Sequence, residues 1–559
     1  MKKYVVSLLV LVVCACSQEQ NLPYLKKQGT ATQLMVHGEP FIMICGEANN
    51  STGSHAKFLE ESLKAHRSSN FNSVLVSVSW EIVEPQEGVF DFSSVDEIIR
   101  ICRQNDLKLG ILWFGSWKNG FSPYAPEWVL SDVNRFKRVK SAEGYNTRTL
   151  SPLCKATRDA DAKAFLELMK HVAKVDAKEN TVVVIQIENE VGVLGQTRDF
   201  SDEANQLFAS QVPQELMNYL VANKNQIEPE IITAWEVNGL KTAGTWTEIF
   251  GDNYDTEMFF MAWHYSTFIN YIAEQGKQIY HIPMFTNCWM SGPRPNPGKP
   301  GNYPSGGPVL AALDIWKAGG PSIDFLSPDI YSGDFKIKTA SYHREDNPLF
   351  IPESSQIEGR ATYAFAEHDA IGFSPFASDF MWGIRAQTGY PQTMEREYKF
   401  LSQMMPLIIK HQGTGLMRGI FRDGNVESDN GYEFILNKEI KVKITYQTPD
   451  RGRTTEITSN NRQQPPPSYG LFIKTGENEF MVAGLNLSVS CESLNPTRTV
   501  WLKNAWEGII EHGEFKPQGL LNGDEAGFLR SNDPIYRIQS IISPGDPGIM
   551  KFSVISYDK

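Results

Sequence analysis

The stretch TVVVIQIENEVG, residues 181–192, decides the fold of this chain. Its first half reads as a buried β-strand, because the side chains of a strand alternate between two faces. Val183, Ile185 and Ile187 share the face that we expect to pack on helices. The opposite face carries Val182, Val184, Gln186, Glu188 and Glu190. An apolar outer face and an acid at the carboxyl end are typical of a parallel barrel whose site opens at that end. A solvated acid where a strand meets a loop is the alternative.

Short apolar runs alternate with amphipathic stretches over residues 34–411. Nine runs are candidates for eight barrel strands: residues 41–45, 73–78, 108–113, 182–187, 231–234, 284–286, 325–327, 349–352 and 371–375. The run at 231–234 is the weakest of them. Between the runs lie helical patterns, such as Phe165, Leu168 and Val172, at the spacing of a helix that packs on a sheet. The alternation predicts an α/β fold, a (β/α)8 TIM barrel. A doubly wound open sheet is the competitor, but no glycine-rich phosphate-binding turn follows an early strand.

The pattern changes after residue 412. Residues 439–446 (EIKVKITY), 480–489 and 551–557 alternate polar and apolar side chains, with turn-rich segments between them. This alternating pattern predicts an antiparallel β-sandwich domain at the C-terminus. We therefore divide the chain into a lipoprotein signal peptide (1–16), a linker (17–33), a catalytic barrel (34–412) and a C-terminal β domain (413–559).

The N-terminus has the features of an export signal. Lys2 and Lys3 precede an apolar run at residues 5–13 that is too short to span a bilayer. The following segment, VCAC, resembles a bacterial lipoprotein signal in which Cys16 is lipidated. An ordinary secretory signal that is cut after Ala15 is the alternative. Either reading predicts an exported protein, and lipidation predicts an anchor in the outer or cytoplasmic membrane, in the periplasm or at the cell surface.

Composition and spacing exclude several kinds of function. The net charge of −12 and the absence of a basic run argue against nucleic acid as a partner. The histidines show no HExxH or HxH spacing and the seven cysteines are scattered, so we predict no metal site and no disulfide framework. No GxSxG motif is present, which disfavours a serine hydrolase of that design. We expect no cofactor. Carboxylates remain as the candidates for chemistry.

Two glutamates end predicted strands. Glu190 ends the opening stretch, and Glu353 follows the apolar run at residues 349–352. Parallel barrel strands open onto one face at their carboxyl ends, so both acids should reach the same site. Glycoside hydrolysis needs such a pair, one acid to protonate the leaving oxygen and one carboxylate to meet the anomeric carbon. Other barrel enzymes also place acids at these positions.

The segment QIENEVG, residues 186–192, resembles the acid/base motif of glycoside hydrolase family 35, the β-galactosidases. That family reads Q-[IV]-E-N-E-Y-G, and this chain has Val191 in place of the tyrosine. The resemblance implies that Glu190 is the acid/base, that Glu353 on strand seven is the nucleophile, and that Asn189 hydrogen-bonds the sugar 2-hydroxyl. A bacterial lipoprotein subgroup of the family with a similar C-terminal β domain resembles this chain most.

The likeness extends across the barrel, with one departure. Residues 80–85 (WEIVEP) and 88–92 (GVFDF) resemble the stretch that follows strand two in the same clan. Residues 112–120 (LWFGSWKNG) fall where typical members carry C-A-E-W, so Ser116 replaces the glutamate that reads galactose hydroxyls. The departure weakens the assignment of galactose and leaves the mechanism untouched.

Further residues are candidates for substrate binding, and for each of them structural packing is an equal alternative. Glu47 ends the first strand and offers oxygens to sugar hydroxyls, and Asn287 ends the fifth. Tyr331 lies where the clan places a tyrosine that bonds the nucleophile. Trp117 and Trp382 are candidates for the floor or wall of a sugar pocket, because aromatic faces stack on pyranose rings. The neighbouring Glu188 also faces inward, as a buried support residue or a rival candidate.

Together these features predict a retaining, exo-acting β-glycosidase with a carbohydrate substrate. We expect a β-galactosidase that releases terminal galactose from a plant-type glycan or oligosaccharide, with its two carboxyl groups about 5–5.5 Å apart. Another retaining activity of the clan, an arabinopyranosidase or a glucosidase, is one alternative. A glycan-binding lipoprotein without catalysis is the other.

Overall fold

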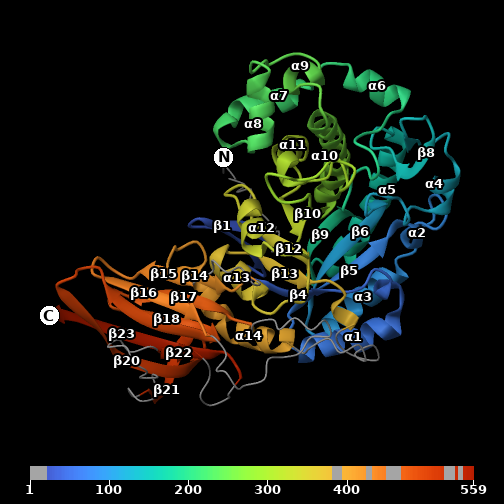
Figure 1. The fold of residues 1–559 in the computed structure, drawn as a ribbon. Coiled ribbons are helices and arrows are strands. Elements are labelled where there is room, and N and C mark those ends of the chain that lie inside the picture. Colours follow the sequence, from blue (N-terminus) through green and yellow to red (C-terminus); the bar gives the residue numbers. More distant parts are fainter. Residues whose placement is uncertain (1–21, 381–392, 424–430, 448–466, 522–535, 539–544) are drawn as a thin grey trace, which may run out of the picture.

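Eight parallel strands form a closed barrel at the centre of the molecule (Figure 1). The computed structural model describes residues 22–380, 393–423, 431–447, 467–521, 536–538 and 545–559. The barrel strands are β4 (Met43–Glu47), β5 (Ser73–Ser79), β6 (Lys108–Lys118), β9 (Val182–Asn189), β10 (Met284–Trp289), β11 (Phe325–Asp329), β12 (Phe350–Ser354) and β13 (Gly372–Pro375). They are neighbours in chain order, and a parallel bridge between Ile330 and Ser354 closes the ring between β11 and β12.

The barrel confirms the predicted fold class, and one predicted strand was wrong. Residues 231–234 lie in a helix, α8 (Pro229–Val237), which belongs to an excursion between β9 and β10. Ile231 and Trp235 are its buried residues, and they lie four positions apart. This i, i+4 spacing is that of a helix, and it cannot be recognised within a run of only four residues.

Helices cover the outside of the barrel. The larger ones are α1 (Ala56–Ser68), α3 (Ser93–Gln104), α5 (Lys155–Asp176), α10 (Tyr254–Ile279), α11 (Leu313–Gly319), α12 (Phe335–Tyr342), α13 (Arg360–Glu367) and α14 (Thr393–His411). Shorter elements are α2 (Trp80–Val83), α4 (Glu127–Ser131), α6 (Asp202–Phe208), α7 (Gln214–Ala222), α9 (Trp246–Phe250) and the hairpin β7 (Arg138–Lys140) with β8 (Asn146–Leu150). Helix α5 buries Phe165, Leu168 and Val172, the face that the sequence predicts.

Strand β9 follows the predicted two-face pattern except at its start. Ile185 and Ile187 join the large cluster outside the barrel, and Val184 joins the smaller cluster within it. Val182 and Val183 exchange their predicted faces, because the pairing with β6 skips one residue between Val182 and Val184. An extra residue of this kind is a β-bulge, and it reverses the faces before it relative to those after it.

A small antiparallel sheet closes the bottom of the barrel. It consists of β1 (Tyr24–Gln28), β2 (Ala31–Val36) and β3 (Glu39–Phe41), which lead directly into β4. Leu34 and Val36 are buried in the same cluster as the barrel-interior residues. Part of the predicted linker at 17–33 is thus regular structure, because β1 and β2 pair along their length. Residues 1–21, with Cys16, lie outside the described residues.

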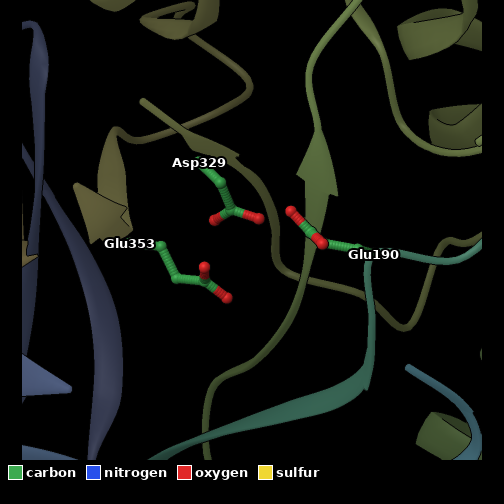
Figure 2. A group of neighbouring side chains, drawn as sticks. All are labelled: Glu190, Asp329 and Glu353. Carbon is green, nitrogen blue, oxygen red and sulfur yellow. The ribbon is translucent and has the colours of Figure 1, made fainter. Parts of the chain in front are cut away.

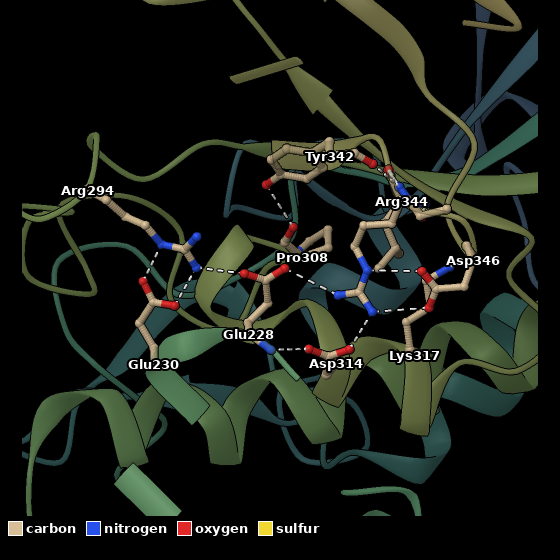
Figure 3. Close-up of polar contacts among 11 residues, drawn as sticks. Glu228, Glu230, Arg294, Pro308, Asp314, Lys317, Tyr342, Arg344 and Asp346 are labelled. Carbon is tan, nitrogen blue, oxygen red and sulfur yellow. Dashed lines mark hydrogen bonds and ion pairs between the residues drawn. The ribbon is translucent and has the colours of Figure 1, made fainter. Parts of the chain in front are cut away.

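A network of ion pairs holds the helical excursion against the barrel (Figure 3). Arg344, after α12, pairs with the buried Asp314 of α11 at 2.8 Å and with Glu228, next to α8, at 3.3 Å. Glu228 also pairs with Arg294 from the loop after β10, at 2.8 Å. Asp314 is 1% exposed, so the charge of Arg344 compensates a carboxylate that water does not reach.

The C-terminal part is an antiparallel sandwich, as predicted. Its six-stranded sheet holds β14 (Met417–Phe421), β17 (Tyr469–Gly476), β18 (Glu479–Leu485), β23 (Gly548–Asp558), β20 (Arg498–Glu511) and β21 (Glu514–Leu520) in that order. Its four-stranded sheet holds β15 (Tyr432–Ile435), β16 (Ile440–Tyr446), β19 (Leu487–Ser493) and β22 (Tyr536–Ile538). A separate apolar cluster lies between the two sheets.

The sandwich packs firmly on the barrel. Apolar residues of β17 and β18, such as Leu471 and Met481, belong to the same cluster as the barrel helices. Glu358 lies before α13 and accepts a hydrogen bond from Tyr469 of β17 at 2.8 Å, and it pairs with Arg396 of α14 at 2.7 Å. Both partners hold a carboxylate that is 5% exposed. The contact is therefore a buried, specific interface, which supports a bracing role for the β domain.

Candidate active site

Three carboxyl groups meet at the carboxyl ends of the barrel strands. Glu190 follows β9, Asp329 ends β11 and Glu353 lies in β12. One oxygen from each lies within 4.8 Å of an oxygen from each of the others. Figure 2 shows the three side chains pointing toward one another from separate strands. Each residue is 5% exposed, so the charges lie in a site with little water. The structure thus brings together the two predicted acids and adds a third.

The end of β9 has an unusual backbone. Glu188 and Glu190 have positive φ angles of 60° and 45°. Non-glycine residues adopt this region rarely, and such strain concentrates at functional sites. The backbone amide of Glu190 donates to Asn287 Oδ1 at 3.0 Å. This turn directs the side chain of Glu190 toward the other two carboxyl groups.

Three donors surround the carboxylate of Glu353. Asn189 Nδ2 donates to Oε1 at 3.2 Å, and Asn287 Nδ2 reaches the same oxygen at 3.4 Å. The hydroxyl of Tyr331 donates to Oε2. Several donors around one carboxylate stabilise its negative charge and fix its orientation. The predicted substrate-binding residues Asn189, Asn287 and Tyr331 therefore all lie at the site, in contact with Glu353.

The environment of Glu190 favours its protonated form. Burial and, to a smaller extent, the charge of Glu353 raise its pKa from 4.5 to about 7. The charge of Lys118 and a hydrogen bond with Asp329 act in the opposite direction. A carboxyl group with a pKa near neutrality is suited to donate and to accept a proton in turn.

Glu47, the last residue of β4, faces the same site. It is 1% exposed, and among the described residues neither of its oxygens has a hydrogen-bond partner. Burial raises its pKa well above the usual range, and the charge of Glu353 adds to the rise. A buried carboxyl group without hydrogen-bond partners lowers the stability of the protein, and a ligand that donates hydrogen bonds to it removes this penalty. The placement agrees with the predicted contact to sugar hydroxyls, a role that stays a prediction.

A buried lysine that the sequence analysis missed completes the site. Lys118, at the end of β6, is 7% exposed, and its Nζ donates to Asn189 Oδ1 at 2.9 Å. The same Nζ lies 4.8 Å from the centre of the Phe114 ring. Its charge lowers the pKa of both Glu47 and Glu190. The only signal in the sequence is a lysine that ends a long apolar run, LGILWFGSWK.

Ser116 does not face the site. Its hydroxyl donates to Asp161 of α5, and its backbone amide donates to Glu188 Oε1 at 3.0 Å. Glu188 also accepts a hydrogen bond from the backbone amide of Trp117 at 2.6 Å. Of the two predicted alternatives for Glu188, a buried support residue or a rival catalytic candidate, the structure therefore favours the support residue. Burial and Asp161 raise the pKa of Glu188 well above its usual range, so the pair retains a proton. The cluster fixes the backbone that presents Lys118.

Gly115 lies in the middle of this cluster. A Cβ atom there would lie 2.5 Å from Trp113 Nε1, 2.6 Å from Glu188 Oε1 and 2.7 Å from Asp161 Oδ2. Only glycine lets the backbone approach these buried groups so closely. The position therefore needs glycine for reasons of space.

The predicted role of Trp117 in a sugar pocket was wrong. Its side chain is 1% exposed, and it packs edge-on against Tyr265 and Phe268 of α10. Its indole nitrogen donates to the carbonyl of Leu150 at 2.9 Å. Trp117 points toward the helices, because the neighbouring Lys118 takes the side that faces the site. Trp382 lies outside the described residues.

An exposed tryptophan stands at the mouth of the barrel. Trp289 ends β10, pairs in register with Asp329 and is 41% exposed. Side chains alternate along a strand. Asn287 points into the site and Cys288 contacts Tyr342 on the outside at 3.1 Å. Trp289 therefore lies on the same side as Asn287, above the carboxyl groups.

The three carboxyl groups are also close enough together to hold a metal ion. Carboxylate oxygens suit hard cations such as magnesium or calcium, but only in their ionised form. Burial and neighbouring charge raise the pKa of Glu190 and Asp329. Protons therefore compete with a cation for these oxygens at neutral pH. The sequence predicts no metal site, and that prediction needs a direct test.

The fold and the carboxyl cluster define a barrel protein with a site of the glycoside hydrolase type. Residues 52–249 match the family model of glycoside hydrolase family 42, described as β-galactosidase. Residues 394–531 match a domain of unknown function (DUF5597). The first match includes Asn189 and Glu190 but ends before Glu353. It supports a β-galactosidase likeness, while the finer assignment to family 35 stays a prediction.

Several β-galactosidases are similar to this chain in sequence or in fold. The β-galactosidase of Xanthomonas manihotis is 26% identical over 195 residues, which are 34% of this chain and 30% of the relative. Among solved structures, the β-galactosidase from Bacillus circulans sp. alkalophilus has 14% identity and a TM-score of 0.43, over 65% of this chain and 56% of that one. The catalytic domain of a β-amylase from Paenibacillus polymyxa has 12% identity and a TM-score of 0.42, over 64% and 97%.

Proposed function

We propose that this protein is a retaining β-glycosidase that acts on terminal galactosyl residues. One observation carries the proposal: Glu190 and Glu353 approach to within 4.8 Å of each other at the carboxyl end of a closed barrel. Retaining enzymes hold their two carboxyl groups about 5–5.5 Å apart, whereas inverting enzymes need about 6.5–9.5 Å to admit a water. The separation here favours direct attack by a carboxylate.

In the first step, Glu353 attacks the anomeric carbon while Glu190 protonates the leaving oxygen. Asn189, Asn287 and Tyr331 orient the attacking carboxylate through the hydrogen bonds described above. The carbon–oxygen bond to the leaving group breaks as the ester bond to Glu353 forms. The leaving group departs with the proton from Glu190.

In the second step, Glu190 accepts a proton from water, which attacks the anomeric carbon and releases Glu353. Once Glu353 is esterified, its charge no longer raises the pKa of Glu190. Glu190 then ionises more readily and becomes the better base that this step requires. The sugar leaves with its original anomeric configuration, because two inversions cancel.

Two comparisons support galactose as the sugar. The family 42 match and the Xanthomonas manihotis relative are both described as β-galactosidases. The QIENEVG motif resembles family 35, whose bacterial lipoprotein subgroup is our finer assignment. We propose exo action on a plant-type glycan or oligosaccharide. The alternatives are an arabinopyranosidase or glucosidase, and a glycan-binding lipoprotein without catalysis.

We also propose that the protein is exported and anchored to a membrane through Cys16. The support is the N-terminal sequence alone. Among the described residues, no helix is long and apolar enough to cross a membrane. Labelling of growing cells with a radioactive or clickable fatty acid tests the proposal, with Cys16→Ser as the control. Equal labelling of the two proteins would exclude lipidation at this residue.

A panel of nitrophenyl glycosides tests the activity. We expect release from the β-galactoside, a loss of at least 10³-fold in Glu353→Gln, and retention of configuration by proton NMR of the first product. Glu190→Ala should spare a substrate with an acidic leaving group, such as dinitrophenol, more than one with a poor leaving group. Release from another glycoside alone would change the substrate, and unchanged turnover in Glu353→Gln would refute the mechanism.

A further inference from the structure

Asp329 is the third carboxyl group of the cluster, and its two oxygens have different surroundings. Oδ2 accepts a hydrogen bond from Asn287 Nδ2 at 2.8 Å. Oδ1 is buried, and among the described residues it has no hydrogen-bond partner. Asn287 also donates to Glu353 and accepts from the amide of Glu190, so one side chain connects all three carboxyl positions. Asn287 therefore holds Asp329 through Oδ2, and the carboxyl group of Asp329 also makes a hydrogen bond with that of Glu190.

Several titratable groups face Asp329 from the surrounding strands. They are Glu190 after β9, Glu353 on β12, Glu47 on β4, Cys288 on β10 and Tyr331 after β11. The thiol and the phenol are neutral at pH 7, because burial raises the pKa of Cys288 to about 12 and that of Tyr331 above its usual range. The cation at the site, Lys118, bonds Asn189 instead.

A site this crowded does not ionise completely. Like charges within about 5 Å in a buried site raise one another's pKa, and at least one group stays protonated. Tyr331 and two asparagines donate to Glu353, which stabilises its charge. Asp329 receives one donor on Oδ2. A proton on Oδ1 leaves the hydrogen bond from Asn287 to Oδ2 intact. Burial and the charge of Glu353 raise the pKa of Asp329 well above its usual range, in agreement with this geometry.

We propose that Asp329 is a neutral carboxylic acid in the resting site and donates a hydrogen bond from Oδ1 to a hydroxyl of the sugar. This inference rests on the proposed function, because it places the sugar between Glu190 and Glu353. The donor gives the buried Oδ1 its missing partner and adds a contact that discriminates between sugars. The substrate class is a neutral glycone, since a uronic acid would bring a second negative charge next to Glu353 in a buried site.

Two substitutions at Asp329 distinguish a neutral Asp329 that donates a hydrogen bond from an ionised Asp329 that only accepts one. In Asp329→Asn, the amide oxygen can still accept from Asn287 while the amide nitrogen donates in place of Oδ1. In Asp329→Ala, both bonds are lost. We expect kcat/KM to fall about 10- to 100-fold in the alanine variant, and to be at least tenfold higher in the asparagine variant than in the alanine variant. Circular dichroism and thermal melting verify that both variants fold.

The dependence of kcat/KM on pH tests the charge of Asp329, which a purely structural role would not affect. The basic limb of kcat/KM reports the ionisation of Glu190. A neutral Asp329 contributes no charge, and the amide of Asp329→Asn can still donate a hydrogen bond to Glu190, so this substitution should leave the limb within about 0.3 pH units of the native position. An ionised Asp329 would raise the pKa of Glu190, and its removal would move the limb to lower pH by about 1 unit. Asp106→Asn is the matched control, at an exposed position that precedes the start of β6, whereas Lys118 of the site lies at the opposite end of that strand.

Substrates that lack single hydroxyl groups locate the contact. Deoxy versions of the aryl glycoside that the enzyme cleaves are compared in the native protein and in Asp329→Ala. For one deoxy substrate, the loss caused by the alanine substitution should disappear, because the bond is already absent. An equal loss for every deoxy substrate, a shift of the basic limb in Asp329→Asn, or an asparagine variant as poor as the alanine variant would overturn the inference. Turnover that survives in Glu353→Gln would instead overturn the proposed function.

Discussion

Replacing Glu353 with glutamine should lower the pKa of Glu190. That pKa is raised from 4.5 to about 7, first by burial and then by the charge of Glu353. The substitution keeps the size of the side chain and removes only the charge. The pKa of Glu190 should therefore move back toward 4.5, and the part of the rise that burial causes should persist.

The size of the change follows from the geometry. The carboxyl oxygens lie within 4.8 Å of each other, and two charges at this upper limit, at an effective dielectric constant of about 20, interact by roughly 3.5 kcal/mol, or about 2.5 pH units. That value would account for the whole rise and would leave nothing for burial, which is the larger cause. Screening at the mouth of the site must therefore reduce the interaction. We expect the charge to account for less than half of the rise, and the pKa of Glu190 to fall by about 1 pH unit.

Carbon-13 NMR of protein labelled at the glutamate carboxyl carbons measures this pKa directly. Glu190→Gln assigns the signal by its disappearance. Lys118→Met is a control of opposite sign, because the charge of Lys118 lowers the pKa of Glu190 and its loss should raise it. A Glu190 that titrates at the same or a higher pH in Glu353→Gln would refute the reasoning. So would a shift in the same direction in both variants.

Four further predictions concern substrate, stability and cofactor. Trp289→Ala should raise KM about tenfold for a galactosyl oligosaccharide but less than twofold for a nitrophenyl galactoside. The reason is that the exposed ring can stack on a sugar beyond the cleaved bond. Equal effects on the two substrates would exclude this stacking. Arg344→Met should lower the free energy of unfolding by about 3 kcal/mol in urea titrations, because the buried Asp314 loses its cation. A change below about 1 kcal/mol would show that the ion pairs of Arg344 are dispensable for stability. The thermal midpoint should fall as the pH rises from about 4.5 to 7. Folding raises the pKa of Glu190 and of Glu397 from 4.5 to about 7, so the folded protein binds more protons than the unfolded chain in this window and loses stability as the pH rises. A midpoint that rises across this window would contradict the prediction. Dialysis against EDTA should leave turnover unchanged, and a loss that magnesium or calcium restores would assign the three carboxyl groups to a metal.

The barrel was predictable because it depends on local patterns. Buried parallel strands are continuous apolar runs, and the helices between them repeat at the helical period, so the order of elements is visible in the sequence. The exception is instructive. Residues 231–234 lie in a short helix whose buried residues are Ile231 and Trp235, and a run this short does not show whether its period is that of a helix or of a strand.

The residues that face the site were harder to predict than the strands that carry them. At the end of β6, the sequence draws attention to Ser116 and Trp117, yet Asp161, Glu188 and helix α10 hold both of them away from the site. Lys118 takes the inward position instead. A shift of one position reverses the face of a side chain, and the bulges of β6 and β9 that set the register depend on contacts with other strands.

By itself, the sequence determined the alternation of strands and helices, the antiparallel texture of the C-terminal part, and two acids at the ends of strands. These features depend on residues close together in the chain. The tertiary structure alone decided that Asp329 and Lys118 join Glu190, Glu353 and Glu47, and that Glu188 supports the backbone instead. The reason is physical: the charge state of a carboxyl group depends on its burial and on neighbours within a few ångströms. Those neighbours come from strands separated by many residues, and only the closed barrel brings them together.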